Sequence, residues 1–345
     1  MASHVVPETY FVGYPALDMD EMTRYLRDTG NLDFLQTILD AKAQGVSDAG
    51  ILASYYAKLC YDALKVGNNL NVDRVRDIPD NVRGTITAGH GSVFEHAMLN
   101  FTVTNCSRVF THELVRHRAG TAFSQTSGRY VRGDNIKFVF DPILKPIEVE
   151  GRAFLAMLEQ FYRGLCDKMG LNGVQGVRRF LTQQVPILDD QKRISGTQDA
   201  APTDAQVDEF IRVVHGKSPA DFEKLPFSIK KKVTSALRRY LPNGQSNEIG
   251  VSLNIRAVRH FFMLRTAGGA EWEIRVIANQ MFDLVKARHP LLVFDAKERE
   301  VDGQREIYGM KLQPYDIMVE DVRTLADYSQ DELLAEMDRR RSATA

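Results

Sequence analysis

The densest group of chemically capable side chains in the sequence begins at Arg116-His117-Arg118. The residues that follow include hydroxyl and amide side chains and a glycine, namely Thr121, Ser124, Gln125, Thr126, Ser127, Gly128, Arg129 and Tyr130. Guanidinium forks, hydroxyl donors and exposed backbone amides are the groups that bind a phosphate or pyrophosphate. A solvated loop after a basic helix end is the alternative, because cations also suit the carboxyl end of a helix. The residue types alone leave both interpretations open.

A second cationic group consists of Arg256, Arg259, His260 and Arg265. On a helix, Arg256 and His260 are four residues apart and share a face, while Phe261, Phe262 and Leu264 are expected to be buried. An arginine beside an apolar helix needs a carboxylate or a ligand anion as its partner. Spacing by itself favours an ion pair with Glu271 or Glu273.

The histidines do not form a recognisable metal motif. His90 and His96 flank the segment Gly91 to Glu95, but the spacing is not HExxH, and no acid or thiol completes a familiar zinc ligand set. His112 and His117 fail the same test. We expect a structural or ligand-orienting role for these residues and no metal.

No nucleophile stands out. Cys60 and Cys166 lie in apolar helical patterns and are expected in the core. Cys106 precedes a predicted helix, where its pKa could be lowered, but nothing nearby in sequence supplies a general base, so a structural role is favoured. Ser127 lacks a GxSxG elbow. The sequence therefore offers no convincing nucleophile.

The 345 residues carry 44 Lys plus Arg against 45 Asp plus Glu, for a net charge of -1. This balance argues against a protein that coats nucleic acid or an anionic membrane, but a small anion needs only a few arginines. No apolar run is long enough to span a bilayer, and the N-terminus has no basic segment of a signal peptide. Unpaired cysteine spacing suits a reducing compartment, so a cytoplasmic location is expected.

Hydrophobic periodicity predicts helices separated by a few short strands. Residues 1–33 are expected to be irregular, and the tail from 326 onwards to fray. The predicted helices span 34–66 with a break near Gly45, 107–117, 148–170, 228–240, 256–267 and 270–289, and the predicted strands span 98–103, 136–140 and 248–255. The polar stretch 186–225 is expected to be an insertion with one helix near 205–214. No GxGxxG or P-loop motif occurs. This pattern predicts an α+β fold with a mixed, largely antiparallel sheet flanked by helices.

Several of these segments together resemble flavin-dependent thymidylate synthases. The run from Arg116 to Tyr130 is similar to the family signature RHRxxSxNxxSxRY. The family also has an acid–histidine pair before a strand, an Arg before Leu-Pro, an N-x-R segment, a later Leu-Arg and a Trp-Glu-Ile. They are matched in the same order by Glu95-His96, Arg238 with Leu241-Pro242, Asn254 with Arg256, Leu264-Arg265 and Trp272-Glu273-Ile274. The resemblance covers roughly residues 85–290.

The resemblance implies a site for FAD and dUMP. The residues implied for FAD are Ser92, Arg116, His117, Arg118, Gln125, Asn254, Arg256 and His260. Those implied for dUMP are Glu113, Arg116, Gln125, Thr126, Ser127, Gly128, Arg129, Arg238 and Arg265. The family assembles as a homotetramer with shared sites. NADPH and methylenetetrahydrofolate are implied as co-substrates, and no metal is expected.

The role implied for Arg265 is catalytic. A guanidinium fixed against a uracil ring favours ionisation at N3 and makes C5 more electron-rich, so that C5 attacks a one-carbon unit without help from a cysteine. The implied activity is reductive methylation of dUMP to dTMP. Alternatives are a related C5-modifying enzyme, for example one that forms a hydroxymethyl pyrimidine, a non-catalytic nucleotide- or flavin-binding homologue, and a structural protein with salt-bridged arginines.

The chain departs from the family pattern at two places in the signature region. The signature is one residue longer between Arg118 and Ser127, and Glu113 stands where the family often has Gln near the nucleotide phosphate. A carboxylate repels a phosphate, so Glu113 is expected to turn away or to make another contact. The expected organisation is an N-terminal helical extension over 1–84, a catalytic domain over 85–295 and a C-terminal extension over 296–345.

Overall fold

The computed structural model describes residues 3–130, 136–171, 186–197, 203–216 and 227–311. The chain divides into two compact units. The first comprises residues 1–6, 107–109 and 125–247, and the second comprises 7–106, 110–124 and 248–345.

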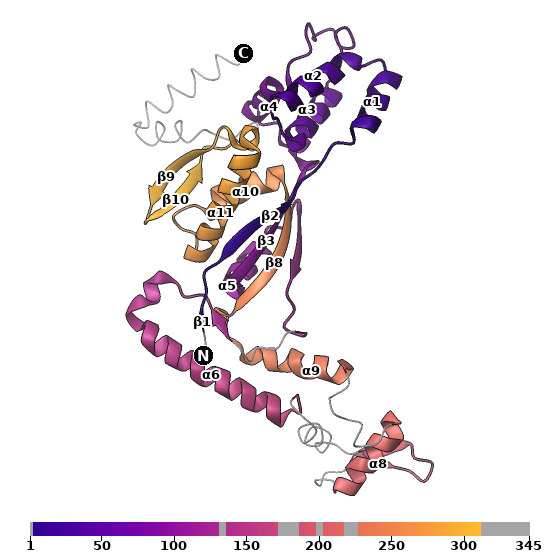
Figure 1. The fold of residues 1–345 in the computed structure, drawn as a ribbon, viewed down its shortest axis with the longest axis vertical. Helices are drawn as coiled ribbons and strands as arrows, with labels where there is room; N and C mark the ends of the chain where they lie inside the picture. Colours follow the sequence, from indigo (N-terminus) through magenta and orange to yellow (C-terminus); the bar gives the residue numbers. More distant parts are fainter. Residues whose placement is uncertain (1–2, 131–135, 172–185, 198–202, 217–226, 312–345) are drawn as a thin grey trace, which may run out of the picture. The chain divides into compact units, whose positions relative to one another are not determined.

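A four-stranded sheet, in the order β2-β3-β8-β4, organises the second unit (Figure 1). Its strands are β2 (Glu8–Gly13), β3 (Met98–Ser107), β8 (Ser246–Asn254) and β4 (Thr121–Gln125). β2 runs antiparallel to β3 and places Phe11 opposite Phe101, with the two rings stacked 4.8 Å apart. Leu99, Phe101 and Val103 alternate with more exposed neighbours, which buries one face of β3.

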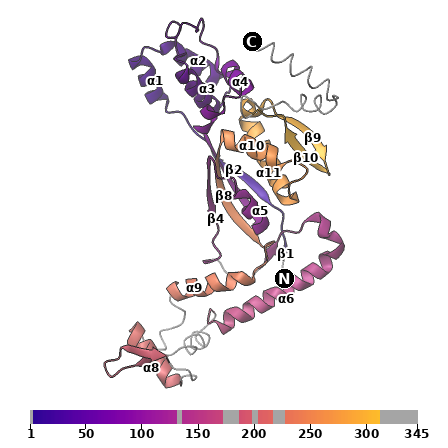
Figure 2. The same cartoon turned by 180° about the vertical axis from the view of Figure 1, so that it is seen from behind.

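Two helices pack on this sheet. They are α10 (Ile255–Arg265), which begins where β8 ends, and α11 (Trp272–Arg288), which contacts β2. Figure 2 shows both beside the hairpin formed by β9 (Lys297–Val301) and β10 (Gln304–Tyr308). The buried side chains Phe261, Phe262 and Phe282 join these helices to the apolar face of the sheet in one core. The short helices η1 (Gly91–Glu95) and η5 (Pro290–Val293) precede β3 and follow α11.

Four helices near the N-terminus complete the second unit. They are α1 (Met19–Asp28), α2 (Leu32–Ala43), α3 (Asp48–Cys60) and α4 (Ile78–Thr87). Side chains of Asp18, Ser47 and Asp77 cap α1, α3 and α4 by accepting a hydrogen bond from a first-turn N–H. Buried residues of all four helices belong to the same apolar core as the sheet.

The first unit contains a parallel pair of short strands, β1 (Ser3–His4) and β5 (Lys137–Phe138), and a hairpin of β6 (Pro186–Leu188) and β7 (Ile194–Thr197). Its helices are η2 (Pro142–Ile147), α6 (Glu148–Lys168), α8 (Asp204–His215), α9 (Phe227–Leu237) and η4 (Arg238–Tyr240). α6 packs against α9 through a small buried cluster, Tyr162, Cys166, Val233 and Leu237. The remaining helix, α5 (Arg108–Leu114), has residues in both units.

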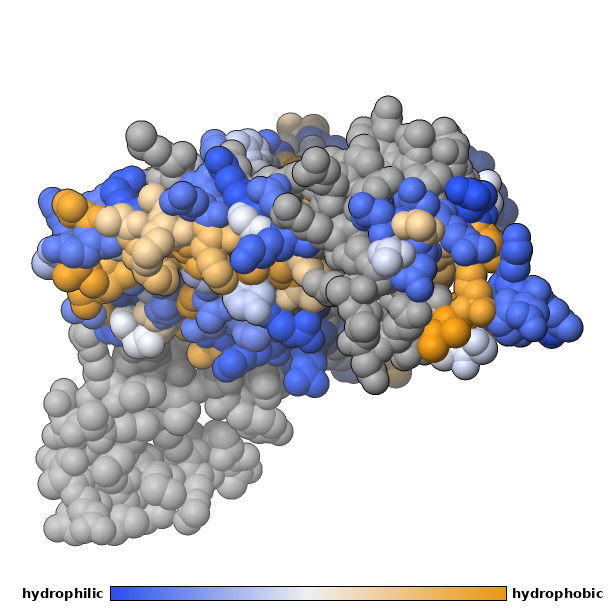
Figure 3. Space-filling view, turned by 90° about the horizontal axis from the view of Figure 1, so that it is seen from below, coloured by the Kyte–Doolittle hydropathy of each residue, from blue (hydrophilic) through white to orange (hydrophobic). Residues whose placement is uncertain are grey.

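The opposite side of α6 is apolar but exposed. Figure 3 shows apolar side chains gathered along this helix. The exposed apolar side chains of α6 and the short helix before it are Ile143, Leu144, Ile147, Val149, Phe154, Met157 and Phe161. A contiguous apolar face of this kind is typical of a surface that another chain covers.

The α+β fold with its mixed, largely antiparallel strands is confirmed, as are the helices at 34–66 with the break at Gly45, where φ is +77°. The expectation that residues 1–33 are irregular is wrong. Within β2 only Phe11 is buried, so the strand has no clear alternation of apolar and polar residues, and pairing with β3 supplies its backbone partners. α4, β4 and the two hairpins were also not predicted, and the tail from 326 lies outside the described residues.

Among the described helices, none combines the length and the apolar character needed to cross a bilayer.

A buried ion pair fixes α10 to the chain that follows α11. The Arg259 side chain, 2% exposed, donates from both terminal nitrogens to Asp295 at 2.8 Å and also to the carbonyls of Leu292 and Lys311. We predict that Arg259→Met destabilises the protein by about 3–5 kcal/mol, because Asp295 and the carbonyls lose their donors. Urea unfolding measures this cost.

The control is Lys286→Met, which breaks the exposed ion pair with Glu298 and should cost under about 1 kcal/mol. Equal midpoints for the two variants would contradict the prediction.

Candidate functional site

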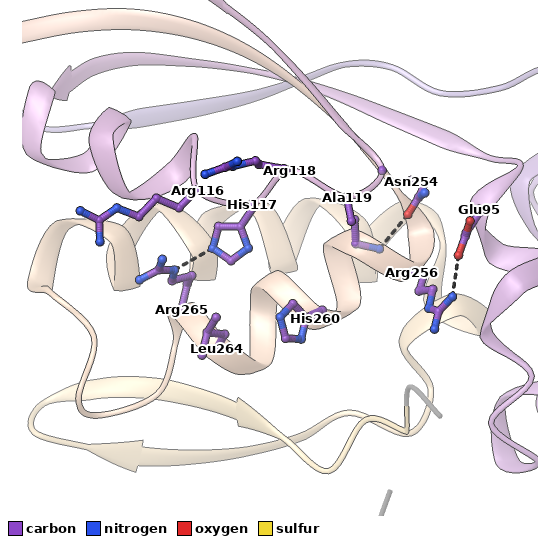
Figure 4. Close-up of a pocket in the computed structure, with 12 residues that line it drawn as sticks. Glu95, Arg116, His117, Arg118, Ala119, Asn254, Arg256, His260, Leu264 and Arg265 are labelled. Atoms are coloured by element: carbon purple, nitrogen blue, oxygen red, sulfur yellow. Dashed lines mark hydrogen bonds and ion pairs between the residues drawn. The ribbon is translucent and has the colours of Figure 1, made fainter. Parts of the chain in front are cut away.

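A cavity of about 700 Å³ opens in the second unit, where α10 faces the segment that follows α5 (Figure 4). Its volume is that of a site for a small molecule or cofactor. The lining is unusually cationic and consists of Glu95, Arg116, His117, Arg118, Ala119, Gly120, Asn254, Arg256, Ala257, His260, Leu264 and Arg265.

The start of α10 is anchored to the signature segment. Asn254 caps the helix, because its side-chain oxygen accepts from the N–H of Ala257 at 2.8 Å, and its own N–H donates to the carbonyl of Gly120 at 2.8 Å. Gly120 has φ +68°, and a Cβ at this position would lie 2.2 Å from the side-chain nitrogen Nδ2 of Asn254. Glycine is therefore required here by both the backbone conformation and the close approach.

Arg265, the last residue of α10, is held by two partners. Its Nη1 donates to Glu113 Oε2 at 2.7 Å, and its Nε donates to His117 Nε2 at 2.8 Å. The Arg265 side chain is 17% exposed and that of Glu113 is 28% exposed. The ion pair and the imidazole fix the guanidinium at the wall of the cavity and leave part of it accessible.

His117 is neutral in this arrangement. Burial lowers its pKa to about 4, with smaller contributions from Arg265 and His260. Since Arg265 donates to Nε2, the ring accepts at that atom and carries its proton on Nδ1. Phe261 contacts the imidazole edge to face at 5.1 Å. His117 is thus a fixed acceptor that orients Arg265.

The other cations of the cavity differ in their pairing. Arg256 Nη1 lies 2.6 Å from Glu95 Oε1, an exposed ion pair that brings α10 to η1. The side chains of Arg116 and Arg118, in contrast, have no acceptor among the described residues, although both line the cavity. Arginines of this kind, beside a cavity, are suited to an anionic ligand.

The other predicted substrate residues belong to the first unit. Gln125 ends β4, and Thr126 to Arg129 follow it. A Cβ at Gly128 would lie 3.5 Å from Arg108 and 3.7 Å from Arg238, so this glycine sits against two guanidinium-bearing side chains. Thr234 donates its hydroxyl to the Arg129 carbonyl at 2.5 Å. Burial, and then Arg238, lowers the pKa of Arg108. These residues form a second cationic group within that unit.

Several predictions are corrected by the structure. The arginines of α10 do not pair with Glu271 or Glu273, which lie at the start of α11; their partners come from distant segments and are Glu95, Asp295 and Glu113. Leu264 is not buried but lines the cavity. Arg116 to Arg118 follow α5, which ends at Leu114, and do not form the last turn of a helix.

Among the cysteines, Cys166 is buried as expected, but Cys60 is exposed. Burial, and then Glu273, raises the pKa of Cys106, so the thiol is not activated by the helix that follows it.

Ser92 lies in η1, exposed, and does not line the cavity. His96 stacks on Tyr56 with ring centroids 3.7 Å apart. Within the described ranges, no group of His, Cys, Asp and Glu is arranged to hold a metal ion. Ala119 and Gly120 were not identified from the sequence as lining residues. In the sequence, nothing distinguishes Gly120 from other glycines that form turns.

A family model described as thymidylate synthase complementing protein matches residues 45–291. This chain belongs to the flavin-dependent thymidylate synthase family. The matched region contains every residue that lines the cavity. The enzyme of that name from Geobacter sulfurreducens is 27% identical over 261 residues, which cover 74% of this chain and 85% of the relative. Three further relatives with this name are matched over 58% to 65% of their own length.

Two solved structures are similar to the chain at low sequence identity. Thymidylate synthase X from Helicobacter pylori, with FAD and dUMP, has a TM-score of 0.40 at 14% identity and covers 83% of this chain and 96% of its own. A UMP/dUMP methylase, PolB, from Streptomyces cacaoi has a TM-score of 0.41 at 15% identity, with 85% and 95% covered.

The protonation of His117 gives a direct test of the site geometry. We predict an imidazole pKa of about 4, measured by NMR of histidine-labelled protein. Between about pH 6.5 and pH 4 the unfolded chain takes up a proton that the folded chain does not, so this group lowers stability as the pH falls through that window. Arg265→Met should raise the pKa only in part, because burial is the larger cause. A wild-type pKa near 6.5 would refute the arrangement.

Proposed function

We propose that this protein catalyses the reductive methylation of dUMP to dTMP, with FAD as its cofactor and methylenetetrahydrofolate and NADPH as co-substrates. The observation that carries the proposal is Arg265, fixed by Glu113 and His117 at the wall of a cavity that also presents Arg116 and Arg118. Family membership supplies the reaction type.

The cavity fits a flavin dinucleotide in its chemistry. Arg116 and Arg118 are cations without an acceptor among the described residues, as a pyrophosphate requires. Asn254, Arg256 and His260 line the same wall and offer further hydrogen-bonding groups. FAD, when bound, would supply the reducing electrons. The chain's part is to bind and orient it, with Arg116, His117, Arg118, Asn254, Arg256 and His260 as the binding residues and Ser92 and Gln125 as the remaining candidates.

Arg265 would act on the pyrimidine. Its Nε and Nη1 are engaged by His117 and Glu113, which leaves Nη2, with only a long 3.5 Å contact to the Glu113 carbonyl, to meet a ring oxygen or the N3 anion. A guanidinium in a fixed position stabilises the ionised ring without reorganising as the charge develops. The ring is then nucleophilic at C5. The raised pKa of Cys106 agrees with a route that uses no thiolate.

The nucleotide phosphate and sugar would be bound by Gln125, Thr126, Ser127, Gly128, Arg129 and Arg238. In the first unit the side chains of Arg108 and Arg238 lie against Gly128, which supports an anion site at this loop. We further propose that these residues serve sites shared between copies of the chain in a homotetramer. The exposed apolar face of α6 supports this, because such a face is stabilised when another chain covers it.

Glu113 motivates the second candidate function, a related enzyme that adds a different group, for example hydroxymethyl, at C5. Its carboxylate neutralises part of the charge of Arg265, so the field at the ring differs from that of an unpaired guanidinium. Mass spectrometry of the product separates the two: a gain of a methyl group on dUMP supports methylation, and a gain of a hydroxymethyl group supports the alternative.

Purified protein should absorb visible light as a flavoprotein and convert dUMP to dTMP with NADPH and methylenetetrahydrofolate. We predict that Arg265→Met lowers kcat/KM by about 10²- to 10³-fold, the usual cost of losing one fixed oxyanion donor. Steady-state kinetics measures the loss.

The matched control for this variant is Arg83→Met, which removes an exposed arginine of α4 whose ion-pair partner within the described residues is Asp80. Its kcat/KM should stay within about twofold of the wild type, as is usual for surface substitutions. Flavin-loaded protein that leaves dUMP unchanged would overturn the proposed function.

The tetramer has its own test in sedimentation equilibrium. The double substitution Phe154→Glu and Met157→Glu places two charges in the exposed apolar face of α6, and we predict dissociation into smaller species because a buried, unpaired carboxylate is costly. Gln160→Lys, an exposed polar position of α6 that lies outside the line of Phe154, Met157 and Phe161, should leave the assembly intact. A wild-type monomer, or a double variant of unchanged mass, contradicts the proposal.

A further inference from the structure

A second cavity, of about 370 Å³, lies in the second unit between the end of α3, one side of α4 with the residues just after it, and the segment 61–77 that joins the two helices. It shares no lining residue with the cavity described above. The residues that line it are mostly polar or charged and consist of Lys58, Tyr61, Ala63, Asn69, Asn71, Val72, Asp73, Arg74, Arg76, Asn81, Gly84, Thr85, Ala88 and His90.

Lys58 is the most unusual member of this lining. Lys58 is only 3% exposed, yet its ammonium group makes no hydrogen bond or ion pair with any described residue. Its Nζ lies over the face of the Phe34 ring, 5.7 Å from the ring centroid. Lysines that are almost fully buried normally have a paired charge. Burial, followed by Arg76, lowers the Lys58 pKa to about 8, while Asp77 raises it slightly. An ammonium group without a partner among the described residues is costly to bury, and Lys58 is one of the residues that line the cavity.

Two arginines line the same cavity. Arg74 and Arg76 have exposed side chains that make no ion pair with the described residues. The guanidinium of Arg76 lies over α4, since a Cβ at Gly84 would be 3.8 Å from its Nη1. Asp73 is the single carboxylate in the lining, so positive charge is in excess. An excess of cations over carboxylates is expected where an anion is to be bound.

The lining also contains neutral hydrogen-bonding groups. Asn81 accepts a hydrogen bond from Ser54 at 2.9 Å through its carbonyl oxygen, which leaves its NH₂ group as a donor. Asn69 and Asn71 are joined by a hydrogen bond from the Asn71 N–H to the Asn69 side chain at 2.9 Å, which fixes the loop. The Tyr61 hydroxyl lies 3.0 Å from His90 Nδ1, and both residues line the cavity. The wall thus offers fixed amide and hydroxyl groups beside the cations.

We propose that this cavity is a second ligand site, which binds a small oxyanionic molecule carrying phosphate or carboxylate groups, with Lys58, Arg74 and Arg76 as its charged partners. The volume suits a molecule of modest size, at the lower end of small-molecule sites. An oxyanion would give Lys58 the partner that it lacks among the described residues, and it would raise the lysine pKa towards its ordinary value. Nothing in this site depends on the proposed methylation reaction.

Isothermal titration calorimetry of the full chain with pyrophosphate, and separately with glutarate, tests the site at constant ionic strength. The expected result is a class of sites, one per chain, whose affinity falls at least tenfold in both Lys58→Met and Arg76→Met. Arg83→Met, an exposed arginine of α4 outside this lining, should retain it within twofold. Anion binding at the Arg116 cavity is present in all variants and cancels in the comparison.

The two probes distinguish the source of the charge. Loss of pyrophosphate binding in the two variants assigns a phosphate-bearing ligand, and loss of glutarate binding assigns a carboxylate. Arg76 is exposed, so its substitution tests the site even where Lys58→Met perturbs folding. Isotherms for Arg76→Met that match those of Arg83→Met with both probes overturn the proposal, as does the absence of binding by either probe.

Discussion

The guanidinium of Arg265, fixed between a carboxylate and a neutral imidazole, is the contact on which the candidate site depends. Glu113 and His117 come from the segment that follows β3, and Arg265 comes from the far end of α10, so the contact joins chain segments about 150 residues apart. An arginine in a short ion pair and a second hydrogen bond loses most of its freedom, which gives a preorganised donor. Without these partners, the same side chain would sample solvent and act only as a diffuse positive charge.

α10 carries this geometry. Asn254 fixes its first turn to Gly120, Arg265 ends it against Glu113 and His117, and between them Phe261 and Phe262 are completely buried. The helix is therefore attached to the signature segment at both ends and to the core in the middle. The bidentate pair of Arg259 with Asp295 holds the opposite side. Because a buried helix of this kind cannot slide without breaking several contacts, the cavity keeps its shape before any ligand arrives.

The arginines of the second unit fall into two groups according to what their side chains contact. One group stabilises the fold, and the other is suited to binding a ligand. Arg259 is buried with a full set of acceptors and stabilises the fold. Arg116 and Arg118 line a cavity with no acceptor among the described residues, and Arg76 lines another in the same state beside the buried Lys58. A cation without a counter-charge destabilises the protein as long as no ligand is bound. A bound anion supplies that counter-charge and stabilises the folded protein. Both cavities follow this principle, although their linings are unrelated.

The sequence by itself determined the family, the α+β class, most long helices and the identity of the cavity arginines. These features can be predicted because hydrophobic periodicity and the order of motifs are properties of the sequence itself. Only the tertiary structure decided which carboxylate meets which arginine: Arg265 pairs with Glu113 and not with the acids at the start of α11, where the Glu271 side chain instead accepts hydrogen bonds from the N–H groups of Glu273 and Ile274. It also decided that residues 8–13 form a strand, since a strand's backbone partners lie far away in sequence. Likewise, Lys58 is buried with its ammonium group over the Phe34 ring of α2, a contact that no local pattern specifies.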